Sequence, residues 1–322
     1  MKRLCLILLP ALGLGFSPLN GSAQSWPTKS LRAVVPIAAG SLADIVPRVV
    51  FEQLSIQLGQ TIVVDNRPGA GMTIGTNVVA KADPVGYTLL VTSSAHTIAP
   101  SLYAGLSYHP ARDFAAVAPL GVSPFVLVVP PARGYRTARD LVNAAKARPG
   151  AFNFSSPGVG TASHLSAERF RNSTGLQAAH VPFKGGVEAM TEVIAGRMDF
   201  FFVALGPALP HVRSGKLSAL AVNGTERTPA LPDVPTTSEA GFPNAEYPLW
   251  IGMFVPAKTP RAIVDRLSSE TLRALREPRV KDKLASLGVD PMPMTPVEFG
   301  ALVEKEIAIN ATLVKASGLN PQ

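Results

Sequence analysis

Cysteine is almost absent from this chain of 322 residues, because the single one, Cys5, lies in the first few positions. Histidine is scarce as well: there are five, and none belongs to an H-E-x-x-H motif or to a cysteine-containing metal motif. The G-x-S-x-G sequence that exposes the serine nucleophile of many hydrolases is also missing. We therefore expect no disulfide, no metal site, no cofactor and no catalytic residues.

The first residues have the three parts of a secretory signal peptide. Met1-Lys2-Arg3 is basic, Leu4 to Phe16 is apolar, and Gly21-Ser22-Ala23 supplies the small residues that signal peptidase requires. We predict that residues 1–23 are removed and that the exported chain begins at Gln24. The apolar run is too short to span a membrane, and no later segment has the length of a membrane helix. The mature protein is therefore expected to be soluble and free of cysteine.

Basic residues outnumber acidic ones but are scattered along the chain. The net charge is +8, and it falls to about +6 once Lys2 and Arg3 are removed. No run of lysine and arginine alternates with aromatic residues, so no nucleic-acid partner is expected. We interpret the excess charge as solvated surface with a mild attraction for anions.

Short β-branched runs alternate with longer helical patterns, which is typical of βαβ units on mostly parallel sheets. The first series has strands at 31–36, 61–64 and 87–92 and helices at 42–58 and before 82. A second series follows the apolar stretch 114–130, with strands at 152–155, 178–181, 198–203 and 217–222 and helices at 137–147, 161–173, 187–195 and 208–214. After a proline-rich connector, 225–248, a tail has a strand at 249–255 and helices at 260–275, 279–287 and 296–317.

The tail has too little sheet to stand alone, so we expect it to return to the first series of elements. The chain would then form two α/β lobes, one from residues 24–122 and 248–322 and the other from residues 123–247. Two crossings between the lobes leave a cleft, and clefts at lobe interfaces are where small ligands bind.

Three strand-to-helix turns carry small residues and hydrogen-bond donors. They are Pro36 to Asp44, Thr92 to His96 and Ser155 to His164, and each follows a strand that an α/β lobe directs toward its ligand-binding crevice. Glycine lets the backbone approach a ligand closely, and the first turn of a helix has unpaired N–H groups at the positive end of its dipole. The turns predict an anion site, although ordinary helix capping also explains such turns.

Several side chains in these turns have two interpretations. Asp44 either contacts a ligand amine or hydroxyl or is favoured by the helix dipole alone. His164 either lines the cleft or is a structural histidine, and the other four histidines are interpreted as structural or surface residues. Gly158-Val159-Gly160 lacks the third glycine of a dinucleotide fingerprint, and no lysine follows it as in a Walker loop, so nucleotide binding is not expected.

Six stretches give the chain a specific resemblance to a known family. They are Trp26 to Arg32, Val64 to Gly71, Asp83 to Leu90, His180 to Gly185, Leu231 to Thr236 and Val314 to Gly318. In this order and spacing they resemble the Bug family, the periplasmic substrate-binding proteins of the tripartite tricarboxylate transporter system. The resemblance runs from about Trp26 to Gly318, which is effectively the whole mature chain.

The resemblance implies a type II-like Venus-flytrap fold whose two α/β lobes close on a carboxylated small molecule, held by backbone N–H groups and ordered water. It also implies a periplasmic location and delivery to a membrane permease, and we expect a monomer. The residues expected to contact the ligand are Ala39, Gly40, Ser41, Asp44, Ser93, Ser94, His96, Ser156, Gly158, Val159, Gly160, Thr161, His164, Phe183, Val203 and Ala204.

Two departures from the family pattern bear on specificity. Where members usually have Pro-Gly-Gly, this chain has Ala39-Gly40-Ser41, which adds a methyl and a hydroxyl group near the expected carboxylate. Where members commonly have Asp-Asn after a strand, this chain has Val203-Ala204, so a carboxylate that would hold an amine is missing. We expect a preference for a carboxylate without a charged amine, with an apolar or aromatic body.

Two alternatives to a transport receptor remain open. A ligand-sensing component of an extracytoplasmic signalling system would have the same fold and the same ligand. A secreted hydrolase would need Ser93, Ser94 or Ser156 to be activated by His96 or His164, and no acid is spaced to orient either histidine as a triad requires.

Overall fold

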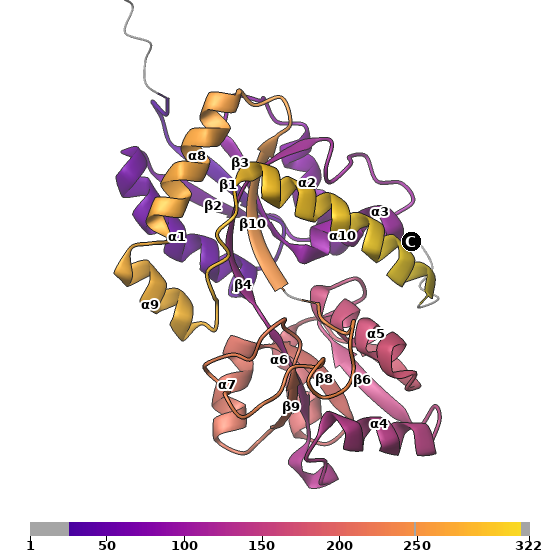
Figure 1. Ribbon diagram of the computed structural model, residues 1–322. Helices are drawn as coiled ribbons and strands as arrows, with labels where there is room; N and C mark the ends of the chain where they lie inside the picture. Colours follow the sequence, from indigo (N-terminus) through magenta and orange to yellow (C-terminus); the bar gives the residue numbers. More distant parts are fainter. Residues whose placement is uncertain (1–25, 248, 317–322) are drawn as a thin grey trace, which may run out of the picture.

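The structure is a computed structural model that describes residues 26–247 and 249–316. It has two α/β lobes, one above the other in Figure 1, and each contains a five-stranded sheet flanked by helices. This confirms the predicted two-lobed α/β fold class, and the sheets, expected to be mostly parallel, are mixed. The predicted signal peptide, residues 1–23, lies outside the described residues.

The sheet of the first lobe has the order β2-β1-β3-β10-β4. Its strands are β1 (Leu31–Val35), β2 (Ile62–Asn66), β3 (Thr88–Ser93), β4 (Phe114–Ser123) and β10 (Leu249–Pro256). β10 runs antiparallel to both of its neighbours, whereas β1 is parallel to β2 and β3. The accompanying helices are α1 (Leu42–Leu58), η1 (Ala70–Met72), α2 (Thr73–Ala80), η2 (Ser94–Ile98), α3 (Ala99–Leu102), α8 (Arg261–Ala274), α9 (Pro278–Ser286) and α10 (Pro296–Ala316).

The second sheet repeats this pattern in the order β7-β6-β8-β5-β9, with β5 antiparallel to both neighbours. Its strands are β5 (Phe125–Val129), β6 (Phe152–Ser156), β7 (Ala178–Pro182), β8 (Phe200–Ala204) and β9 (Ser218–Val222). The helices of this lobe are η3 (Pro131–Arg133), α4 (Ala138–Ala147), α5 (Ala162–Thr174), α6 (Gly186–Ile194) and α7 (Leu205–Arg213).

Local sequence signals explain where the two helices nearest the predicted turns begin and end. α1 stops at Gly59, whose φ of 67° places it in the left-handed region that glycine adopts without a steric penalty. α5 begins after Thr161, whose hydroxyl accepts the N–H of His164, and it ends at Gly175 with a φ of 69°. The N-terminus of α5 is therefore fixed by its cap, six residues after the end of β6.

The chain crosses between the sheets at Pro124 and again in the stretch before β10. The predicted apolar run 114–130 is thus two strands, β4 and β5, with a proline between them that has no N–H to continue a ladder. β10, from the predicted tail, lies between β3 and β4. We propose the division into residues 24–122 with 248–322 and residues 123–247 on this basis.

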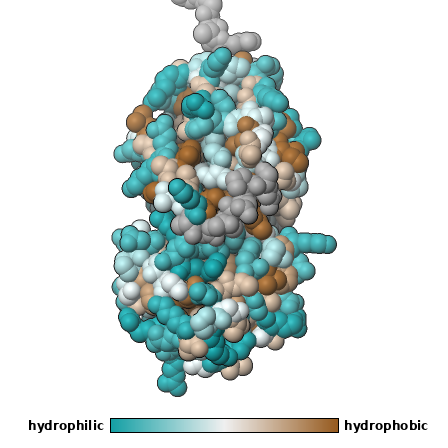
Figure 2. Space-filling view, turned by 90° about the vertical axis from the view of Figure 1, so that its right-hand side faces the viewer, coloured by the Kyte–Doolittle hydropathy of each residue, from teal (hydrophilic) through white to brown (hydrophobic). Residues whose placement is uncertain are grey.

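The lobes also touch through an apolar cluster, which we call the interlobe cluster. It contains Ile98 and Leu102 from the first lobe together with Ala162 and Leu165 from α5, all buried. At one contact the backbone of Gly160 lies so close to Leu102 that an added Cβ would stand 2.6 Å from Leu102 Cδ1. Figure 2 shows the lobes as two rounded masses with a narrowing between them.

A second close approach lies near the crossing at Pro124. A Cβ on Gly206, in α7, would stand 2.4 Å from the carbonyl oxygen of Leu287 in the first lobe. Ser123 donates its hydroxyl to the Gly288 carbonyl at 2.8 Å, and Leu205 N–H donates to the Pro124 carbonyl at 3.1 Å. Within residues 26–247 and 249–316, none of the helices has the length and apolar character needed to cross a membrane.

Candidate ligand-binding site at the strand-to-helix turns

The turn between β6 and α5 is held by its own side chains. Ser156 Oγ accepts the Gly158 N–H at 3.0 Å, and Thr161 Oγ1 donates to the Gly158 carbonyl at 2.8 Å. His164 Nδ1 accepts the Gly160 N–H at 3.1 Å. The two glycines have φ values of 134° and 76°, which other residues rarely adopt. The glycines thus shape the turn, and their N–H groups are already used within it.

The N–H groups left over in this turn belong to the start of the helix. The hydrogen bonds of the turn use the N–H groups of Gly158, Gly160, Thr161 and His164, and within residues 26–247 and 249–316 the N–H groups of Ala162 and Ser163 have no acceptor. The first N–H groups of a helix have no partner inside it and point beyond its N-terminus. They lie at the positive end of the helix dipole, where a carboxylate is favoured.

The turn between β1 and α1 follows the same plan. Gly40, with a φ of 84°, donates its N–H to Asp44 Oδ2 at 2.9 Å, so the glycine N–H is again used inside the turn. Ser41 is the N-cap residue, and its carbonyl accepts the N–H groups of Asp44 and Ile45. The N–H of the next residue, Leu42, has no acceptor in the part of the chain that the structure describes. Ala39 and Gly40 are exposed.

Asp44 is buried and fully engaged by protein donors. Its Oδ1 accepts Arg48 Nε at 3.0 Å and Asn66 Nδ2 at 2.9 Å, in addition to the Gly40 N–H on Oδ2. Burial acts to raise the pKa of Asp44, but the hydrogen bonds from Arg48, Gly40 and Asn66 outweigh it, so the pKa lies below its usual value. These contacts give Asp44 a role that neither interpretation included, because the carboxylate closes its own turn.

The third predicted turn, at the end of β3, is buried. Ser93 and Ser94 are both inaccessible, and Ser94 begins the 3-10 helix η2. His96 is only 2% exposed and packs edge-on against Phe114, with 5.3 Å between ring centroids. Its Nε2 lies 3.2 Å from the Pro110 carbonyl oxygen, and burial lowers its pKa to about 4. Aromatic packing holds the His96 ring inside the first lobe, and its expected contact with a ligand stays a prediction.

The remaining predicted residues of the second lobe are mostly apolar. Phe183 is half-buried, and its N–H donates to the Ser156 carbonyl at 2.9 Å, which ties the segment after β7 to the turn after β6. Val159 is 39% exposed at the tip of the turn. Val203 is buried at the end of β8, and Ala204 is the half-buried residue before α7.

One apolar cluster links the two helix N-termini. Leu42, the first residue of α1, packs against the interlobe cluster, and so does Ala204 of the second lobe. Ala162, the first residue of α5, is a member of the cluster. The first residues of α1 and α5 therefore both border one apolar cluster that includes residues of both lobes.

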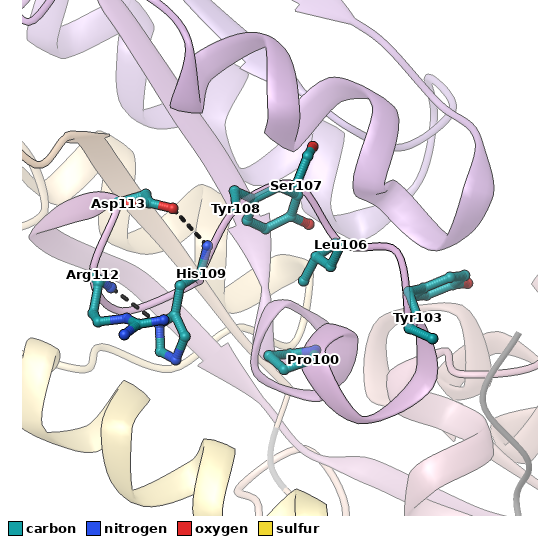
Figure 3. A pocket seen from close by; sticks show the side chains of 9 residues that line it. Pro100, Tyr103, Leu106, Ser107, Tyr108, His109, Arg112 and Asp113 are labelled. Atoms are coloured by element: carbon teal, nitrogen blue, oxygen red, sulfur yellow. Dashed lines mark hydrogen bonds between the residues drawn. The ribbon is translucent and has the colours of Figure 1, made fainter.

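A surface cavity of about 390 Å³ lies elsewhere on the first lobe, in the loop that leads to β4. Figure 3 shows Tyr103, Tyr108, His109 and Arg112 around it, and Asp113 Oδ2 accepts the His109 N–H at 2.7 Å. None of the predicted contact residues lines this cavity. Among the residues that the structure describes, no three histidine, cysteine or acidic side chains are grouped to hold a metal ion.

The sequence did not predict several residues whose side chains contact Asp44 or His164 in the β1–α1 and β6–α5 turns. Asn66 and Arg48 hold Asp44, and His180 and Glu168 contact or face His164. Asp44 with Arg48, and His164 with Glu168, are spaced four apart on a helix, and this spacing places such pairs on one face. His180 had no such signal, because its ring meets the turn through the pairing of β6 with β7.

The closest pairing of a serine with a histidine involves His180, which the sequence did not single out. Ser156 Oγ lies 2.6 Å from His180 Nε2, but the hydroxyl is fully buried and also accepts the Gly158 N–H. A nucleophile must reach its substrate, and this serine instead stabilises its own turn. The pairing therefore does not support the hydrolase alternative.

Comparisons with known proteins agree with this geometry. Protein BugT from Bordetella pertussis is 33% identical over 299 residues, which cover 92% of this chain and 92% of BugT. The structure of R. palustris Rpa4515 with adipate has a TM-score of 0.84 at 31% identity, covering 92% of this chain and 100% of that one. The structure of MatC (Rpa3494) from Rhodopseudomonas palustris with bound malate has a TM-score of 0.80 at 32% identity. The match covers 90% of this chain and 100% of MatC. Residues 46–319 match the tripartite tricarboxylate transporter family receptor. The chain therefore belongs to this family of periplasmic solute-binding proteins, which includes the Bug proteins.

Proposed function

We propose that this chain is a periplasmic receptor that captures a small organic carboxylate between its lobes and delivers it to a membrane permease of a tripartite tricarboxylate transporter. The observation that carries the proposal is the pair of helix N-termini at the interlobe cluster, α1 from one lobe and α5 from the other. The glycine N–H groups beside them are used internally, so the first N–H groups of each helix remain for an anion.

The similar proteins support the class of ligand. Rpa4515 and MatC, which match this chain over nearly their whole length, were solved with adipate and malate, two small dicarboxylates. A dicarboxylate has one charged group for each helix N-terminus, and its connecting carbons would lie against the apolar side chains of the interlobe cluster. In this proposal, the contacts come from the β1–α1 turn, Ala39 to Ser41, and from the β6–α5 turn, Ser156 to Thr161.

The charges around the turns favour an acid without an amine. Two carboxylates lie near them, and protein donors already engage both: Asp44 is held by Arg48 and Asn66, and Glu168 by Arg171 at 2.6 Å. Val203 and Ala204 add only apolar surface. A ligand ammonium group would therefore lose its hydration without gaining a free carboxylate partner, which is unfavourable in a buried site.

A thermal-shift panel on the mature protein, beginning at Gln24, tests the proposal. We expect citrate, malate, adipate or an aromatic acid to raise the melting temperature, because a ligand that binds only the folded state stabilises it. Adipamide, which keeps the carbon skeleton of adipate without its charges, is the matched control and should have no effect. No shift with any organic acid would contradict a carboxylate receptor, and a shift with aspartate or glutamate alone would contradict the preference against amines.

Delivery to a permease needs its own test. We expect the closed, ligand-loaded receptor to bind the membrane components of the transporter more tightly than the free receptor, as ligand-driven population shifts require. Co-purification of membrane partners with the tagged mature protein, with and without the acid found in the panel, measures this. Capture of a signalling receptor instead of a permease would support the sensing alternative.

A further inference from the structure

Two stacked imidazole rings lie directly beside the glycine turn of the second lobe. The ring centroids of His164 and His180 are 3.9 Å apart, with 16° between the ring planes. His164 Nδ1 accepts the Gly160 N–H at 3.1 Å, and His180 Nε2 lies 2.6 Å from Ser156 Oγ, the acceptor of the Gly158 N–H. Each ring therefore holds one glycine of the turn, His164 directly and His180 through a hydroxyl.

The His164 ring is buried and contacts its neighbours on several sides, although its Nε2 has no hydrogen-bond partner among the described residues. The ring has no exposed surface, and Phe154 stacks against it at a centroid distance of 6.1 Å. Because Nδ1 is an acceptor, the proton of the neutral ring is on Nε2, which faces Glu168 Oε1 at 3.7 Å. Arg171 Nη1 donates to the same carboxylate oxygen at 2.6 Å. A carboxylate held in this way favours the tautomer whose free Nδ1 accepts the glycine N–H.

The second ring is neutral at pH 7. Burial, together with the neighbouring His164, lowers the pKa of His180 to about 3. A neutral His180 can stack on His164 without repulsion between two positive charges.

The N–H groups of the turn therefore fall into two sets: those bonded within the turn and those left for a ligand. Glycines with φ values of 134° and 76° have many conformations available when nothing holds them. Once Ser156 Oγ accepts the Gly158 N–H and His164 Nδ1 accepts the Gly160 N–H, the peptide leading into α5 has one orientation. The N–H groups of Ala162 and Ser163 are then set before any ligand arrives, and donors fixed in advance bind an anion more tightly than donors that must be ordered.

We propose that His164 is a positioning residue for the ligand: its Nδ1 acceptor fixes the Gly160 peptide and so directs the first N–H groups of α5 toward the ligand carboxylate. The inference deepens the proposed function and rests on it, because it assumes that a carboxylate binds at this helix N-terminus. His164 itself does not touch the ligand in this account.

Three substitutions distinguish the effect of the Nδ1 acceptor of His164 from the effect of its stacked ring. His164→Phe keeps a ring to stack on Phe154 and His180 but leaves the Gly160 N–H without an acceptor. His164→Asn places an amide oxygen near the position of Nδ1, and His164→Gln places its amide near the position of Nε2 instead. We expect His164→Phe and His164→Gln to bind adipate about tenfold more weakly than wild type in calorimetry, and His164→Asn to recover most of the affinity.

The Gly160 amide gives a readout that needs no ligand. In NMR hydrogen exchange on the full mature chain, we expect this amide to be protected in wild type and His164→Asn and to exchange faster in His164→Phe and His164→Gln. An unchanged Gly160 amide in His164→Phe, or wild-type affinity for adipate in that variant, would overturn the inference. If wild type binds no acid at all, the proposed function fails while the Gly160 amide still decides whether His164 fixes the turn.

Discussion

At the scale of single residues, the candidate site depends on polar side chains that accept hydrogen bonds from the backbone of their own turns. Asp44 and His164 have different chemistry but the same task, because each accepts the N–H of a glycine four residues earlier, Gly40 and Gly160. In both turns the acceptor stands in the first turn of the helix that follows. The first N–H groups of the helix are thereby left for a ligand.

Removing the Asp44 carboxylate tests this arrangement. We expect Asp44→Ala to lower the free energy of unfolding by about 2 kcal/mol at pH 7, because Gly40, Asn66 and Arg48 lose a buried acceptor. Because the pKa of Asp44 is lowered in the folded state, its stabilisation is present above the ordinary value of 3.8 and is lost as the pH falls through the folded value. Urea denaturation should therefore show a difference between variant and wild type that shrinks at acid pH.

Asp265→Ala is the matched control, since Asp265 forms an ion pair with Arg261 four residues away on an exposed helix face. Exposed pairs of this kind contribute roughly 0.2–1 kcal/mol at most. If Asp44→Ala and Asp265→Ala lower the free energy of unfolding equally, the Asp44 contacts add no stability beyond that of an ordinary surface ion pair.

At the scale of elements, α10 is attached to the first sheet through a half-buried carboxyl group. Glu306 accepts the Trp250 indole N–H at 2.9 Å, from β10, and the Thr97 hydroxyl at 3.3 Å, from η2. Burial raises the pKa of Glu306 to about 7, although hydrogen bonds and the charge of Arg169 act in the opposite direction. The helix is therefore held more tightly when this group is protonated.

The direction of the pH effect follows from that shift. The folded pKa lies above the ordinary value of 4.5, so the contribution of Glu306 is fully present below pH 4.5 and is lost as the pH rises through about 7. Glu306→Gln keeps an acceptor without a charge. We expect it to reduce the loss of stability between pH 5 and pH 8 by up to about 3 kcal/mol in urea denaturation. Glu304→Gln, an exposed neighbour on α10, should follow the wild-type pH profile; a Glu306→Gln profile identical to wild type would contradict this account.

Elements were more predictable than side-chain partners. Hydrophobic periodicity and glycine stops located α1 at Leu42–Leu58, as the structure has it, and placed most other elements within a few residues. Periodicity did not separate β4 from β5, since an apolar run through Pro124 has no internal break in pattern. It also gave no indication that His96 is packed among aromatic rings or that His180 meets Ser156, because both contacts join segments distant in sequence.

At the scale of the whole molecule, glycine lets the two lobes approach each other at the candidate site. Gly160→Ala places a Cβ 2.6 Å from Leu102 Cδ1 and imposes a side chain on a residue with a φ of 76°. Gly215→Ala separates these effects, because Gly215 has a φ of 70° but no atom within 4 Å of its added Cβ. We expect Gly215→Ala to lower the free energy of unfolding, measured by urea denaturation, by about 1 kcal/mol. Gly160→Ala should lower it distinctly more.

A double-mutant cycle with Leu102→Ala identifies the origin of the extra cost. Shortening Leu102 removes the atom that the new methyl group would meet, so the two substitutions together should cost less than the sum of the single ones. Additive costs would mean that the lobes do not meet through Gly160 and Leu102 in solution.

The central claim is that the free N–H groups at the start of α5 hold a ligand carboxylate. Ala162→Pro deletes one of them at the first helical position, where proline is well tolerated, and Thr161 already has the extended φ of −69° and ψ of 154° that a following proline needs. Arg261→Pro makes the same change at the start of α8, away from both turns, and serves as the control. Calorimetry with adipate should show one site in wild type and in Arg261→Pro and at least about tenfold weaker binding in Ala162→Pro at similar stability. Equal adipate affinity in Ala162→Pro and wild type would contradict the account.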